Sequence, residues 1–301
     1  VRNEITFTQK TGYKAENYDI KYEPGTLRIT PIVDEVTITI TEHSASLKYN
    51  GAEQSVTGYD TAIDNTLYKE TDFTFSGDAT AKGTDFGSYP MNLKAEDFTN
   101  KNKNFANVVF EIVDGQLEIT KRDVDLISGS DEKVYDGTPL TKNHILIAGD
   151  QFVPGEGADY DVTGSQTNAG SSDNEFTYRL NSSTKAINYN IKTTPGTLKV
   201  TPVTDNVIVT ITEHSGSAKY DGTEKTVTGY DVAIDNELYT ENDFTFRGND
   251  VIKATDADIY NMELKPSDFN NISHNFASVT FKIVDGTLNI SRRDVTLTSA
   301  T

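Results

Sequence analysis

Apolar residues alternate with polar residues or threonine in short runs along most of the chain. Examples are VTITIT at 36–41, NVVFEI at 107–112 and GTLKVT at 196–201. A period of two places the apolar side chains on one face of a strand, and β-branched and aromatic residues favour strands. No segment combines helix caps with an apolar stripe at helical spacing, and residues 91–100 hold at most one helical turn. The pattern therefore predicts an all-β protein.

Turn-forming dipeptides separate these runs every eight to twelve residues. VDGQLEI at 113–119 and VDGTLNI at 284–290 place Asp-Gly between two alternating runs, a combination that predicts β-hairpins. Many short strands with frequent turns are typical of small immunoglobulin-like β-sandwiches, here as tandem modules arranged like beads on a string. A β-grasp-like module is the alternative, and a helix longer than one turn in 91–100 would favour it.

An internal repeat organises the chain. Shifting the sequence by 171 residues aligns 1–130 with 172–301 without a gap, and more than half of the positions in 31–127 are identical to those in 202–298. Such a period indicates a repeat array. The predicted parts are the C-terminal strands of a truncated short module (1–30), a first long repeat (31–121), a short repeat (122–201), a second long repeat (202–292) and the first strand of a further short module (293–301).

A tyrosine followed by Asn or Asp and then glycine occurs once in each repeat. Asn-Gly and Asp-Gly favour turns because both residues tolerate positive φ, and the preceding tyrosine can then anchor its ring in the end of a sandwich. The alternative is a ligand contact in which the rings stack on sugars. No second aromatic residue flanks these tyrosines and the chain has no Trp, so the turn interpretation is favoured. The residues are Tyr49, Asn50, Gly51, Tyr135, Asp136, Gly137, Tyr220, Asp221 and Gly222.

The segments KVYDGTPLT (133–141) and KYDGTEKTVTGYD (219–231) resemble the YDG-type (MBG-like) tandem repeats of large surface proteins of Gram-positive bacteria. The resemblance extends over essentially the whole chain. It implies an extracellular, wall-attached adhesin or stalk, in some cases associated with mucus binding, and it implies no catalytic residues. The sequence has no LPxTG sorting signal, so we expect anchoring through a segment outside it.

The charge balance excludes two classes of partner. The chain has 46 acidic and 27 basic side chains and a net charge of −19 at pH 7, which disfavours nucleic acid and anionic membranes. The absence of cysteine excludes disulfides and Cys-ligated metals. No run approaches 18 apolar residues, so no membrane-spanning segment is predicted.

No catalytic, cofactor-binding or metal-ligating residue is predicted. Gly-x-Ser-x-Gly is absent, no two histidines have metal-ligand spacing, and His43 and His214 are equivalent turn residues. Asp256 and Asp258 would suit a loosely bound calcium ion, but the first long repeat retains only Asp85, so we interpret the loop as a solvated acidic one. An isopeptide crosslink is not expected either, because Glu118 stands where the second long repeat has Asn289.

The sequence thus predicts a non-catalytic spacer that projects a distal binding domain. The alternative is a weak, multivalent binding module for host mucin, another glycan or a protein. The expected partners are neighbouring repeats of the parent chain and, through the apolar strand-forming residues of 1–30, another copy of the chain.

Overall fold

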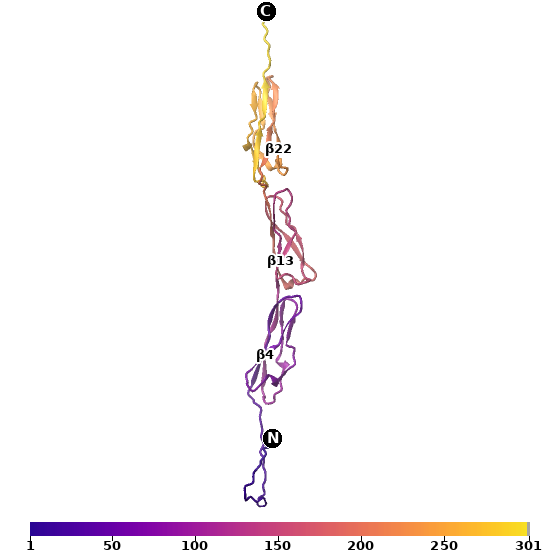
Figure 1. The fold of residues 1–301 in the computed structure, drawn as a ribbon, viewed down its shortest axis with the longest axis vertical. Helices are drawn as coiled ribbons and strands as arrows, with labels where there is room; N and C mark the ends of the chain where they lie inside the picture. The colour runs from indigo at the N-terminus through magenta and orange to yellow at the C-terminus, as the bar shows by residue number, and fades with distance from the viewer. Residues whose placement is uncertain (300–301) are drawn as a thin grey trace. The chain divides into compact units, whose positions relative to one another are not determined.

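The computed structural model describes residues 1–299, which form β-strands and six short 3-10 turns with no α-helix (Figure 1). Figure 1 labels one strand in each repeat, β4, β13 and β22. The all-β prediction is confirmed. Within 91–100 the only helical element is η3 (Ala95–Asp97), a single 3-10 turn. The chain divides into two compact units, one of Val1–Arg122 with Lys185–Asn190 and one of Asp123–Thr184 with the residues from Ile191 onward.

The first long repeat contains ten strands in four small sheets. The sheets have the strand orders β4-β1-β9, β2-β10-β7, β3-β6 and β5-β8. The strands are β1 (Val36–Glu42), β2 (Ala45–Lys48), β3 (Gln54–Thr57), β4 (Tyr59–Ile63), β5 (Phe73–Phe75), β6 (Thr80–Gly83), β7 (Gly87–Pro90), β8 (Phe98–Asn100), β9 (Val108–Val113) and β10 (Gln116–Thr120), with η2 (Glu70–Asp72) before β5.

The first two strands of this repeat lie beside its last two strands and run parallel to them. β1 pairs with β9 from Val36↔Val108 onward, and β2 pairs with β10 from Ala45↔Leu117 onward, with an unchanged register. Both segments therefore leave one sheet and enter the next together. Antiparallel neighbours β4 and β7 complete the two sheets.

The hairpins predicted at the two Asp-Gly dipeptides are not formed. β9 and β10 belong to different sheets, so the chain between them passes from one sheet to the other instead of reversing. The physical reason for the glycine is close packing. A Cβ on Gly115 would lie 2.5 Å from the carbonyl oxygens of Glu42 and His43, and one on Gly286 would lie 2.4 Å from that of His214.

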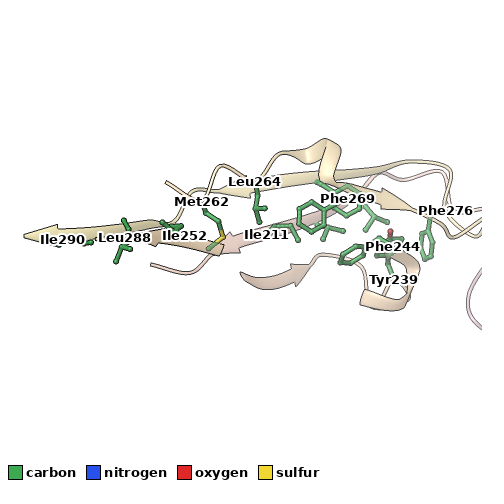
Figure 2. Packing of buried hydrophobic residues seen from close by; sticks show 14 residues of the cluster. Ile211, Tyr239, Phe244, Ile252, Met262, Leu264, Phe269, Phe276, Leu288 and Ile290 are labelled. Atoms are coloured by element: carbon green, nitrogen blue, oxygen red, sulfur yellow. The ribbon is translucent and has the colours of Figure 1, made fainter. Parts of the chain in front are cut away.

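The second long repeat has the same topology and a well-packed core. Its first strand alternates buried Val207, Val209 and Ile211 with partly exposed residues. Figure 2 shows the aromatic end of this core, where the Tyr239 ring meets Phe276 edge-on at 5.1 Å. The strands are β19 (Val207–Glu213), β20 (Gly216–Lys219), β21 (Lys225–Thr228), β22 (Tyr230–Ile234), β23 (Phe244–Phe246), β24 (Val251–Ala254), β25 (Ile259–Asn261), β26 (Phe269–Asn271), β27 (Val279–Val284) and β28 (Thr287–Ser291), with η5 (Glu241–Asp243) and η6 (Pro266–Asp268).

The short repeat forms three sheets, β13-β11-β17, β12-β18-β15 and β14-β16. One cluster of its buried residues consists of Leu140, Leu198 and Val200, and Val124 and Leu126 in another of its sheets are fully buried as well. The strands are β11 (Arg122–Ser128), β12 (Asp131–Val134), β13 (Ile145–Gly149), β14 (Ala158–Val162), β15 (Gly170–Asn174), β16 (Phe176–Leu180), β17 (Tyr189–Thr194) and β18 (Gly196–Thr201), with η4 (Ala186–Asn188) before β17.

The two ends of the chain differ from the sequence prediction. Residues 1–30 hold η1 (Ala15–Asn17) and an isolated bridge between Arg2 and Thr26, but no strand. Residues 293–299 are also without strand structure, and 300–301 lie outside the described residues. A strand needs a hydrogen-bonded neighbour. The equivalent β17 lies beside β11, whereas the described residues give 18–23 no such partner strand.

Candidate functional site: the Tyr-Asx-Gly turns and their surroundings

The tyrosine of each Tyr-Asx-Gly trio extends the parallel strand pair of its repeat by one residue. The backbone N–H of Tyr49 donates to the carbonyl of Thr120 at 2.9 Å. The same bond joins Tyr135 to Thr201 at 2.8 Å and Tyr220 to Ser291 at 2.9 Å. The trio therefore begins where the parallel ladder ends.

The next two residues form a side-chain-stabilised turn in every copy. The side-chain Oδ1 of Asn50, Asp136 and Asp221 accepts the backbone N–H two residues on, each time at 2.9 Å. The following glycines have φ of 83°, 77° and 82°, the left-handed region that glycine adopts without steric cost. This is the geometry of an Asx turn.

The two carboxylates of these turns are engaged by neighbouring donors. Hydrogen bonds from Lys133 and Thr138 lower the pKa of Asp136 to about 2. Bonds from Lys225 and Thr223 lower the pKa of Asp221 as well. Both groups are thus ionised at physiological pH and suit neither a general acid nor a proton shuttle.

The three tyrosine rings have different surroundings. Tyr49 is 3% exposed and meets the Tyr189 ring edge-on at 5.7 Å. Tyr135 meets Phe276 edge-on at the same distance. Tyr220 is 38% exposed. The rings of Tyr49 and Tyr135 are therefore each covered by an aromatic residue of another repeat, whereas the Tyr220 ring is exposed to solvent.

A short segment of the first unit, Lys185–Tyr189 with the sequence KAINY, covers Tyr49 and also binds the acidic loop beside it. Asp85 Oδ2 accepts from Lys185 Nζ at 2.8 Å and Asp85 Oδ1 accepts from Asn188 Nδ2 at 3.0 Å. The Phe86 N–H donates to Asn188 Oδ1 at 2.7 Å. Asn188 is fully buried, and these bonds from Lys185 and Asn188 lower the pKa of Asp85.

Sequence reasoning missed this role of Asp85, which it placed in a solvated loop. The sequence does contain one sign that the segment bound to Asp85 is special: it occurs twice, as KAENY at 14–18 and as KAINY at 185–189. Nothing in the sequence around Asp85 distinguishes its carboxylate from those of the other acidic residues, of which the chain has 46 in total.

The contact between the short repeat and the second long repeat uses other groups. Asn275 Oδ1 accepts the Ala169 N–H at 2.7 Å, and Asn275 Nδ2 donates to Asn168 Oδ1 at 3.2 Å. With the ring pair of Tyr135 and Phe276, this gives a small contact with both polar and aromatic parts.

Two buried glutamates were also missed. Glu42 and Glu213 are 3% and 4% exposed, and each carboxylate accepts two backbone N–H groups. The signal was present in the sequence: in VTITITE the glutamate has the same parity as Val36, Ile38 and Ile40 and therefore faces inward.

The acidic loop of the second long repeat lines a surface hollow of about 420 Å³. Asp258 Oδ1 accepts the Ile259 N–H at 2.8 Å, while Asp256 borders the hollow. In residues 1–299 no three His, Asp or Glu side chains are grouped as metal ligands would be. The hollow is lined by Tyr220, Asp256, Ala257, Arg292, Arg293 and Val295.

Comparison with known proteins gives no assignment, because neither a family model nor a curated protein sequence matches the chain. Within the described residues, no helix has the length and apolar character needed to cross a membrane.

Proposed function

We propose that the chain is a non-catalytic, cofactor-free extracellular spacer of a bacterial surface adhesin, which resists tension while it projects a distal binding domain. The supporting observation is that the first two strands of each long repeat pair in parallel with the last two, β1 with β9 and β2 with β10, and likewise β19 with β27 and β20 with β28. The proposal takes the neighbouring repeats of the parent chain as the partners of each repeat.

Parallel terminal strands determine how a pulling force acts. When the start of β1 and the end of β10 are pulled apart, the load runs along the strands. The evenly spaced ladder bonds then resist shear together instead of opening one by one. The parallel pairing runs from Val36↔Val108 to Lys48↔Thr120. It therefore includes most of the residues in the first two and the last two strands of the repeat. A repeat with this arrangement resists a force that pulls its two ends apart, which is what a spacer under tension needs.

The proposal includes the module type, an immunoglobulin-like β-sandwich repeated in tandem. Its support is that β1 and β9 lie in one sheet, β2 and β10 in another, and that inward residues of both pairs, such as Ile38 and Leu117, are fully buried. A β-grasp-like module would place a helix against its sheet, and the described residues contain only 3-10 turns.

Single-molecule force spectroscopy tests the mechanical proposal. The chain lacks cysteine, so attachment points can be introduced uniquely. Pulling between Asp34→Cys and Lys121→Cys loads the parallel pair in shear and should give one high-force event with a gain in length of about 30 nm, since the first long repeat has 91 residues.

The matched control changes only the second attachment point. Pulling between Asp34→Cys and Asn107→Cys applies force to the starts of both strands, so the ladder bonds break one at a time. We expect a severalfold lower unfolding force for this pair. Equal forces in the two geometries would contradict the mechanical role.

The second candidate function is weak binding of mucin or another host glycan, and the exposed Tyr220 ring favours it. Tyr49 and Tyr135 are covered by other rings, so a gain from multivalency would come from several copies of the chain that each present Tyr220. Binding of the chain to purified mucin and a glycan array, with and without calcium, tests this candidate. Saturable binding that is lost on Tyr220→Ala would support it.

A further inference from the structure

The chain carries a second copy of the segment that binds Asp85. Lys14–Tyr18 reads KAENY and Lys185–Tyr189 reads KAINY. Both contain the same 3-10 turn, η1 and η4, although only η4 is docked against a partner loop. The tyrosine that follows has φ −133° and ψ 131° in the first copy and φ −129° and ψ 145° in the second. The undocked copy thus already has the bound conformation.

The undocked segment exposes the groups that are buried in the docked one. Asn17 is exposed, whereas its equivalent Asn188 is fully buried. Tyr18 is 63% exposed, whereas Tyr189 is 4% exposed. The Tyr18 ring stacks on Tyr13 with 5.3 Å between the ring centroids, yet most of its surface stays exposed. The ring edge and the Asn17 amide are therefore presented to solvent.

The second long repeat carries the matching acceptor surface. Asp256 and Ala257 occupy the positions of Asp85 and Phe86. The loop has a similar conformation, because the Tyr260 hydroxyl donates to the Asp256 carbonyl at 3.3 Å as the Tyr89 hydroxyl donates to that of Asp85 at 2.9 Å.

Among residues 1–299, no KAxNY segment is docked on this acceptor surface. Tyr220 stands where Tyr49 receives the Tyr189 ring, and it borders the 420 Å³ hollow together with Asp256. Among the described residues, none donates a hydrogen bond to the Asp256 carboxylate. The docked segment uses Asp85 as its polar acceptor and Tyr49 as its aromatic contact. Their equivalents in the second long repeat, Asp256 and Tyr220, are both exposed.

We infer that Tyr220, Asp256 and Ala257 form a binding site for a KAxNY segment, and that residues 1–301, taken alone, fill this site with the Lys14–Tyr18 segment of a second copy. Lys14 Nζ and Asn17 Nδ2 donate to the Asp256 carboxylate, and the Ala257 N–H donates to Asn17 Oδ1. The Tyr18 ring packs edge-on against Tyr220. The inference does not depend on the mechanical role proposed above.

The differences between the two sites leave the contacts intact. Phe86 contributes its backbone N–H to the docked segment, and alanine at 257 offers the same group. Ile187 is 53% exposed, so Glu16 at the equivalent position need not be buried. Asp258 adds a second negative charge next to Asp256, whereas Arg292 and Arg293 line the same hollow and offset part of this charge. The docked site has basic residues at the same two positions, Lys121 and Arg122, so the charge balance is similar.

Because the segment and its acceptor are different surfaces, the interface is heterologous and each association leaves one segment and one acceptor unoccupied. We expect concentration-dependent oligomers larger than a dimer. Sedimentation velocity of the whole chain, from micromolar concentration to about 1 mM, measures this directly.

Two single variants and their mixture form the decisive test. Asp256→Asn removes the acceptor charge and Asn17→Ala removes the amide. Each should weaken self-association about tenfold, the loss expected for hydrogen bonds to a charged group. Mixed together, the two variants retain one intact acceptor and one intact segment, so they should form a heterodimer and no larger species. Asp258→Asn is the control of equal charge change and should weaken association far less.

A synthetic peptide of residues 13–21, YKAENYDIK, should compete with self-association, and a peptide with alanine at positions 17 and 18 should not. Circular dichroism checks that the variants retain their fold. A wild-type chain that stays monomeric over the whole range would overturn the inference. Association that is unchanged in both single variants would also overturn it, and would point to strand pairing through 293–299.

Discussion

The Glu42 carboxylate accepts a hydrogen bond from the Gly115 N–H at 2.7 Å at the point where both terminal segments of the repeat change sheets. Its other oxygen accepts the Leu93 N–H at 2.6 Å. The second long repeat has the same arrangement, in which Glu213 accepts from Leu264 and Gly286, both at 2.7 Å. A buried carboxylate satisfied by two backbone donors thus replaces the ladder bonds that are lost where the strands pass between sheets.

Replacing Glu213 with alanine should destabilise the second long repeat by about 2–6 kcal/mol, because two buried N–H groups lose their acceptor at about 1–3 kcal/mol each. Glu213→Gln should lie between this variant and the wild type, since an amide offers one acceptor oxygen. Urea unfolding measures the change. The exposed Glu237→Ala is the control and should stay within about 0.5 kcal/mol of wild type.

Gly286→Ala should also destabilise the second long repeat, by about 1–3 kcal/mol, the usual range for overpacking. The added methyl group would lie 2.4 Å from the His214 carbonyl oxygen, and neither backbone segment can move without breaking the bonds to Glu213. Gly25→Ala is the control, because its Cβ would meet no atom within 4 Å. Thermal unfolding that is equally unaffected in both variants would contradict the close-packing role of Gly286.

The strands and their inward faces were predictable from the sequence, but their pairing was not. Alternation alone places Val36, Ile38, Ile40 and Glu42 on one face, as the structure shows. The parallel partner of that strand, β9, lies about 70 residues along the chain, and no local signal specifies a parallel ladder over such a separation. For the same reason Asp-Gly at 114–115 resembled a hairpin, because a glycine needed for packing and a glycine needed for a turn look alike in sequence.

The candidate site was only partly predictable. The turn chemistry of Asp136-Gly137 follows from residue type, and both the Asx bond and the positive φ are present. The role of Asp85 depends on Lys185 and Asn188, about a hundred residues away. Only the recurrence of KAxNY pointed to that contact, and recurrence does not identify the partner.

Two equivalent histidines should make stability depend on pH. His43 Nδ1 lies 2.8 Å from the Thr57 carbonyl oxygen and Nε2 lies 3.4 Å from Asp60, so both ring nitrogens face acceptors. His214 has the same arrangement with Thr228 and Asp231. Only the doubly protonated ring can donate to both acceptors. The bond to Thr57, followed by that to Asp60, raises the pKa of His43 above 6.5, and Asp231, followed by Thr228, raises that of His214.

A raised pKa in the folded state means that protonation favours folding. The contribution is fully present below the unfolded-state pKa of about 6.5 and is lost as pH rises through the higher folded-state value. The melting temperature of the wild type should therefore fall more between pH 6 and 8 than that of the double variant His43→Gln, His214→Gln. Asp60→Asn with Asp231→Asn should flatten the profile in part. Identical profiles for all three proteins would exclude this linkage.

Asn188→Ala should open the docked segment of the first unit. The fully buried side chain donates to Asp85 and accepts the Phe86 N–H, so its removal leaves these groups without their partner at a cost of about 1–3 kcal/mol. Hydrogen exchange at the Phe86 amide should accelerate, because that amide would lose its acceptor. Asn17→Ala is the matched control from the exposed KAENY copy. It should leave the stability and the Phe86 exchange rate of a dilute, monomeric chain unchanged, because the Asn17 side chain is exposed. If Asn188→Ala exchanged at the wild-type rate, the Lys185–Tyr189 segment would not be held by the acidic loop, and the acceptor site inferred at Asp256 would lose its template.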